Sequence, residues 1–168
     1  VLFANGLSAA TLEQLTVEEM SQKSSVIVRG KVTRCAGEVR GSVIYTRCTV
    51  AVSERWKGQT PAEAEFVIPG GSANGLIQTF TGTPKFNSGE EYVLFLWAGR
   101  SGILQIIGLS QGKFDMKVGK SGETTAFRAA ASERMLDKAG NPVEDQAVEF
   151  SVGALRERVR RALAGAAR

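Results

Sequence analysis

Apolar and polar residues alternate with a period of two through much of residues 26–118, and this pattern restricts the fold more than any other feature of the chain. Because successive side chains of a strand point to opposite faces, the pattern predicts strands with one buried face. Residues 92–97 are almost continuously apolar, which predicts a central strand buried on both faces. The clearest alternating run places these apolar residues on one face: Ile44, Cys48, Val50, Val52 and Trp56.

Turn residues separate the predicted strands. The chain has 168 residues, with 19 glycines and 4 prolines, and a chain of this length buries one core of ordinary size. We therefore expect a single, mainly antiparallel β domain over residues 11–168. No apolar run approaches the ~20 residues that a membrane-spanning helix needs, so we expect no transmembrane segment.

Short helices are expected near both ends of the chain. Thr11 with Gln14, and Thr16 with Glu19, have the capping-box spacing that predicts a helix start. Residues 152–166 predict an amphipathic helix, because arginines occupy one side and an apolar stripe the other. The stripe consists of Val152, Leu155, Val159, Ala162, Leu163 and Ala166.

Residues 1–10 combine an apolar start with the small residues Ser8, Ala9 and Ala10. The end of an export signal has this composition, and a plain flexible terminus explains it equally well. Both interpretations stay open.

The net charge of +4 is concentrated at one end of the chain. Residues 151–168 carry five arginines and one glutamate, and the rest of the chain carries 16 basic and 16 acidic residues. A β body without excess charge has little attraction for phosphate. Nucleic acid is therefore not the expected partner.

The chain contains no histidine. This excludes Ser-His-Asp and Cys-His nucleophile systems and His-containing zinc sites. Ser110 with Lys113 is explained by a polar turn, and the adjacent Glu90 and Glu91 point to opposite faces of a strand. We therefore expect no enzyme activity, no catalytic residue, no metal site and no cofactor.

The two cysteines, Cys35 and Cys48, flank a predicted hairpin. Their direct pairing would place Thr33 opposite Val50, whereas the apolar pattern favours Val32 there. A β-bulge between Val32 and Cys35 would reconcile the two requirements. A disulfide and two separate thiols both stay open, and a disulfide would agree with export to an oxidising compartment.

Four short motifs resemble a family of exported bacterial β-domain proteins whose members are uncharacterised. They are residues 28–32 (VRGKV), 54–58 (ERWKG), 86–96 (FNSGEEYVLFL) and 108–114 (GLSQGKF). More distantly, a strand followed by a Lys-Gly turn and a Gly-Glu-Tyr strand start is similar to netrin modules and tissue inhibitors of metalloproteinases. The resemblance covers about residues 24–118 and implies an antiparallel OB-like β-barrel. The protease-binding site of these inhibitors is not carried over to any residue of this chain.

Irregular segments 69–75 and 81–89 are the expected binding loops, because loops on a rigid barrel commonly carry binding. The expected function is a secreted or periplasmic module that recognises a protein, peptide or envelope component. The alternative is an OB-like domain that binds an oligonucleotide or oligosaccharide, with base or sugar stacking on an aromatic ring. The candidate binding residues are Arg55, Trp56, Lys57, Ser72, Asn74, Lys85 and Phe86.

Overall fold

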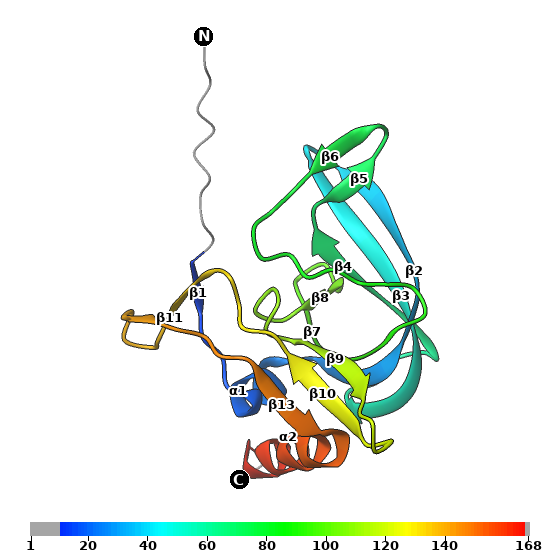
Figure 1. Cartoon of the computed structure of the whole chain (residues 1–168). Helices are drawn as coiled ribbons and strands as arrows, with labels where there is room; N and C mark the ends of the chain where they lie inside the picture. The colour runs from blue at the N-terminus through cyan, green and yellow to red at the C-terminus, as the bar shows by residue number, and fades with distance from the viewer. Residues whose placement is uncertain (1–10, 167–168) are drawn as a thin grey trace.

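The computed structural model describes residues 11–166 and is mainly β, with 49% strand and 14% helix (Figure 1). The expected mainly β class is confirmed. The expectation of a flexible terminus or signal remnant concerns residues 1–10, which lie outside the described residues. Neither helix in the described part of the chain has the length and apolarity that crossing a membrane requires.

The central sheet curves and largely closes on itself. Its strands are β2 (Val26–Arg40), β3 (Val43–Lys57), β4 (Glu63–Pro69), β7 (Glu91–Ala98) and β8 (Leu104–Ile106). Strand β2 pairs with β3, β3 with β4, β4 with β8, and β8 with β7, which pairs again with β2. The circuit surrounds one apolar interior.

Strands β9 (Lys113–Val118), β10 (Thr124–Arg128) and β13 (Val148–Ser151) extend the sheet beyond β7. One edge of β7 pairs with β9 through residues 92–94 and with β8 through residues 96–98. The sheet therefore divides along β7 into the closed part and an extension formed by β9, β10 and β13.

A smaller sheet joins β1 (Thr11–Glu13) to β11 (Arg134–Leu136) in parallel, and β11 to β12 (Pro142–Val143). The helix start predicted at Thr11 is wrong, because Thr11 pairs with Arg134 in this sheet.

Helix α1 (Val17–Lys23) begins instead after the second predicted capping box. The Thr16 hydroxyl accepts from the Glu19 backbone N–H at 3.1 Å, and the Glu19 carboxylate accepts from the Thr16 backbone N–H at 2.9 Å. Two backbone donors at the helix start are thereby satisfied.

Apolar side chains are buried on both faces of the central sheet. The inner cluster includes Val28, Val32, Cys48, Val50, Phe66, Tyr92, Leu94 and Leu96. The outer cluster lies between the sheet and the two helices, α1 and α2 (Val152–Ala166), which are drawn at the bottom of Figure 1. It includes Ile27, Val93, Phe95, Phe114, Leu155 and Val159. Since β7 contributes alternately to both clusters, the predicted central strand is confirmed.

Bulges in the β2–β3 ladder redirect several side chains. Ser53 and Trp56 of β3 have no partner residue in β2, because the register shifts at both places. The inward-outward alternation is therefore interrupted after Val52, and Trp56 packs against the outer cluster. The prediction that Trp56 shares a face with Cys48 is wrong.

Segment 69–75 is largely a hairpin and not the loop that its composition predicted. Strands β5 (Gly71–Ala73) and β6 (Leu76–Gln78) flank a turn in which Asn74 and Gly75 have φ values of 52° and 75°. Positive φ at both central residues is typical of two-residue hairpin turns. Residues 79–90, which include the other predicted loop, contain no strand.

Candidate binding groove

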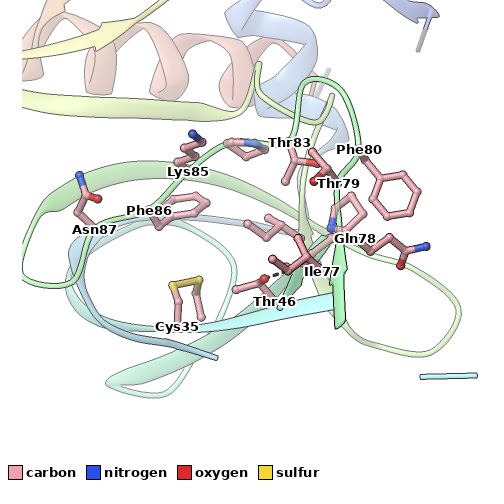
Figure 2. A pocket seen from close by; sticks show the side chains of 16 residues that line it. Cys35, Thr46, Ile77, Gln78, Thr79, Phe80, Thr83, Lys85, Phe86 and Asn87 are labelled. Atoms are coloured by element: carbon pink, nitrogen blue, oxygen red, sulfur yellow. Dashed lines mark hydrogen bonds between the residues drawn. A yellow bond between two sulfur atoms is a disulfide. The ribbon is translucent and has the colours of Figure 1, made fainter. Parts of the chain in front are cut away.

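A groove of about 400 Å³ lies beside the β5–β6 hairpin, and we call it the hairpin groove. The hairpin is at the opposite end of the molecule from the two helices (Figure 1). Figure 2 shows the Cys35–Cys48 bond on one side of it, with Phe86 facing that bond. Other lining residues that matter below are Ile77, Gln78, Phe80, Thr83, Pro84 and Lys85.

The disulfide joins β2 to β3 at one wall of the groove. Cys35 and Cys48 are direct partners in the ladder, with Cα atoms 4.1 Å apart. Val32 pairs with Val50, so Thr33 is the extra residue of a β-bulge. The bulge lies where the apolar pattern and the cysteine pair together required one, and the wall of the groove is covalently fixed.

Aromatic contacts hold Phe86 in place. Its ring centroid lies 5.0 Å from that of Phe66 and 5.1 Å from that of Tyr92, both in edge-to-face geometry. The Tyr92 hydroxyl donates to the Glu90 carboxylate and accepts from the Asn87 backbone N–H, each at 3.0 Å. Burial raises the pKa of Tyr92 to about 12, so the phenol keeps its proton at neutral pH. The second wall is therefore also rigid.

The hairpin is fastened to β3 by side chains. Thr46 Oγ1 donates to the Gly70 carbonyl at 2.7 Å, and Gln78 Oε1 accepts from the Ile44 backbone N–H at 2.7 Å. A Cβ atom at Gly71 would lie 2.2 Å from Thr46 Oγ1, so only glycine allows this close approach. The hairpin is thus held over the groove.

Large apolar side chains are exposed beside the groove. Leu76 is 63% exposed, Ile77 80% and Phe80 38%, and the last two line the groove. Lys85 supplies the single charge among the lining residues. The surface is therefore apolar, with one positive charge at its edge.

Among the predicted binding residues, Lys85 and Phe86 line the groove. Ser72 and Asn74 lie on the hairpin with exposed side chains and do not line it. The sequence interpretation missed Ile77, although two adjacent apolar residues in a three-residue strand between turns are a usable signal of an exposed apolar side chain.

Arg55, Trp56 and Lys57 lie elsewhere, near the end of β3. Trp56 packs against the outer cluster, and Lys57 Nζ donates to the carbonyls of Ser21 and Gln22, at 2.8 Å each. Burial lowers the pKa of Lys57. The structure does not bring these three side chains to the hairpin groove.

Two of the residues considered for catalysis, Lys113 and Glu91, are engaged in ion pairs. Lys113 Nζ donates to Asp115 at 2.7 Å, and the Ser110 hydroxyl has no hydrogen-bond partner within residues 11–166. Arg29 donates to both oxygens of Glu91, at 3.0 Å each. Among the described residues, no group of three or more Cys, Asp or Glu side chains could hold a metal ion.

No protein-family model matches the chain, and no curated protein matches it. These comparisons neither assign the chain to a family nor exclude one.

Proposed function

We propose that the chain is an exported, OB-like β-barrel module that binds an extended peptide segment of a partner protein in the hairpin groove. The closed circuit of strand pairs supports the barrel. The observation that carries the peptide assignment is the exposure of Ile77, at 80%, beside a groove whose walls are both fixed. Exposed apolar patches of this kind mark interaction surfaces.

A free strand edge adjoins the groove. Strand β6 pairs with β5 and with no other strand in the described part of the chain. Such an edge can accept another strand through main-chain hydrogen bonds. Since side chains of an added strand alternate, every second one can face the groove. Main-chain pairing supplies affinity, and the groove selects the side chains.

The lining indicates the chemistry of the peptide. Ile77, Phe80 and Phe86 favour a bulky apolar side chain. Lys85 adds a positive charge at the same place, and no acidic residue among residues 11–166 lines the groove. A carboxylate near the apolar anchor would pair with Lys85, which adds about 0–1 kcal/mol and orients the peptide.

Export is supported by the Cys35–Cys48 disulfide. Disulfides persist in oxidising compartments and are rare in the cytosol. The proposed location is therefore secreted or periplasmic.

Selection from a displayed random-peptide library tests the function. We expect enriched peptides to carry a bulky apolar residue with Asp or Glu within two positions. A photoreactive benzophenone residue at position 77 should cross-link to them, whereas one at Val118, which is 74% exposed and outside the groove, should not. Equal cross-linking at both positions, or enrichment of no sequence, would contradict the proposal. Oligonucleotide or oligosaccharide binding without peptide enrichment would favour the alternative function.

A further inference from the structure

A second groove, of about 350 Å³, is lined by residues from the end of β3 and from helix α2. We call it the α2 groove. Its lining residues are Arg55, Trp56, Gly153, Arg156, Glu157, Val159, Arg160 and Leu163. None of them lines the hairpin groove, and the peptide proposal makes no use of them.

The apolar surface of the α2 groove comes from two partly exposed side chains. Trp56 and Leu163 both pack against the outer cluster, and both line the groove. The indole N–H of Trp56 donates to Glu54 at 3.0 Å, so this contact fixes the orientation of the ring. The groove therefore offers a fixed apolar surface.

Exposed arginine side chains line the same groove. The side chains of Arg156 and Arg160 are 59% and 69% exposed, and Arg55 is exposed as well. Arginine side chains of this kind pack their methylene groups on apolar surface and keep the guanidinium group in solvent. A ligand in the groove can therefore reach these charges without opening a buried contact.

The positive charges at the groove exceed the negative charges that pair with them. Arg55 Nε donates to the Thr60 carbonyl at 3.0 Å, and Arg55 forms no salt bridge with a carboxylate of residues 11–166. Glu157 is the one acidic residue in that range that lines the groove, and it pairs with both Arg160 and Arg161. The groove therefore favours an anion.

Gly153 leaves the groove open near the start of α2. A Cβ atom on Gly153 would meet no atom within 4 Å, and its φ is not positive, so the fold does not require glycine there. Glycine is less favourable than alanine in a helix. The space beside this residue is therefore available to a ligand.

We infer that the α2 groove binds an anionic amphiphile, in which a carboxylate or phosphate head group is attached to an alkyl chain. Guanidinium groups form paired hydrogen bonds with carboxylate and phosphate oxygens. An alkyl chain would cover the exposed parts of Trp56 and Leu163. Bases stack on aromatic rings, and the groove offers one ring beside an aliphatic side chain, so an alkyl chain fits better than a nucleic acid.

The size of the α2 groove agrees with a small ligand. Its volume of about 350 Å³ lies within the range of small-molecule sites, about 300–1,000 Å³. The inference does not depend on peptide binding in the hairpin groove, because the two grooves share no lining residue.

Tryptophan fluorescence of the full chain tests the inference at neutral pH. A Trp97→Phe background leaves Trp56 as the single tryptophan. Titration with decanoate, below its micelle concentration, should change the Trp56 emission and saturate. Acetate has the same charge without the chain, and decyltrimethylammonium has the chain with the opposite charge, so each should bind at least tenfold more weakly.

Co-sedimentation with phosphatidylcholine vesicles that contain phosphatidylglycerol distinguishes the sources of the amphiphile. Vesicle binding admits a membrane lipid, and binding of decanoate alone assigns the groove to free amphiphiles. Absence of binding to decanoate and to the vesicles would overturn the inference. Binding of a thymidine oligonucleotide in place of decanoate would overturn it in favour of a nucleic-acid partner.

Matched variants place the ligand in the α2 groove. Gly153→Leu fills the open space and should weaken decanoate binding at least fivefold, while Gly165→Leu, at an equally open position of α2 outside the groove, should not. The double variant Arg55→Gln/Arg160→Gln should also weaken binding at least fivefold, and the exposed Arg100→Gln should leave it unchanged. Unchanged affinity in Gly153→Leu and in the double variant would overturn the inference, and so would equal affinity for acetate.

Discussion

Oε1 of Glu133 lies 1.1 Å from the position that a Cβ atom on Gly82 would occupy. Gly122 has nearly the same φ, +81° against +80°, but no atom lies within 4 Å of its hypothetical Cβ. The two glycines therefore separate the effect of the carboxylate from the effect of the backbone conformation.

Gly82→Ala should destabilise the protein more than Gly122→Ala. Both variants carry the positive-φ penalty of about 1–2 kcal/mol, and Gly82→Ala should lose about 1–3 kcal/mol more because Glu133 must move. Urea unfolding measures the difference. In a Glu133→Ala background the Gly82→Ala penalty should fall to that of Gly122→Ala. An unchanged penalty in that background would show that the carboxylate is not the obstacle.

Asp145→Asn should be strongly destabilising. Asp145 and Arg128 form an ion pair in which the two side chains are 1% and 9% exposed. Burial raises the pKa of Asp145, but hydrogen bonds from Arg128, the Ala131 backbone and Gln14 outweigh it and keep the pKa below its ordinary value. Removing one partner of a buried pair costs about 3–5 kcal/mol.

The control for Asp145→Asn is Glu157→Gln, which affects an exposed ion pair with Arg160 on α2. This variant should unfold close to the wild-type midpoint, because exposed pairs contribute little. Similar losses for the two variants would contradict the importance assigned to the Arg128–Asp145 pair.

The double variant Cys35→Ala/Cys48→Ala should lose about 3 kcal/mol of unfolding free energy, since the bond closes a loop with a sequence separation of 13. Chemical unfolding without reductant measures this loss. Full reduction should lower the wild-type midpoint towards that of the variant and leave the variant unchanged. A wild-type midpoint that is insensitive to complete reduction would contradict the role given to the bond.

The contribution of Glu19 to the free energy of unfolding should be lost in acid. Hydrogen bonds from Lys138 and from the Thr16 backbone lower the pKa of Glu19 from 4.5 to about 2. A lowered folded-state pKa means that the contribution is complete above pH 4.5 and is lost as the pH falls towards 2. The difference in unfolding free energy between wild type and Glu19→Gln should therefore shrink over this range.

Matched lysine variants check the source of this pH dependence. Lys138→Ala should reproduce part of the change, because it removes the partner of Glu19. The exposed Lys120→Ala should leave the pH dependence as in wild type. A constant difference between wild type and Glu19→Gln from about pH 6 to about pH 2.5 would refute the assignment.

Alternation in the sequence predicts much of the central sheet because burial on one face repeats along each strand. It predicted β7 as buried on both faces, and it showed that direct pairing of Cys35 with Cys48 would need a bulge between Val32 and Cys35, where Thr33 is found. Alternation placed Trp56 on the wrong face of the sheet, because the extra residue Ser53 changes which side chains point inward after Val52. No local signal in the sequence marks that bulge.

The position of Glu133 could not be predicted from local pattern. Residues 129–142 have no periodicity, and their place depends on parallel pairing of β11 with β1, which is more than a hundred residues away in the chain. In the hairpin groove, Lys85 and Phe86 were found through the expectation that long loops carry binding. Ile77 was missed because a strand of unknown partners does not reveal which of its faces is exposed.

The most direct test of the central claim is the affinity of a library-selected peptide for three proteins, measured by fluorescence anisotropy. Ile77→Asp puts a charge in the hairpin groove, and Val118→Asp puts the same charge at a comparably exposed site outside it, with the two side chains 80% and 74% exposed. We predict that Ile77→Asp weakens binding at least tenfold while Val118→Asp binds as wild type. Equal affinity for the wild type and Ile77→Asp would contradict peptide binding in the hairpin groove.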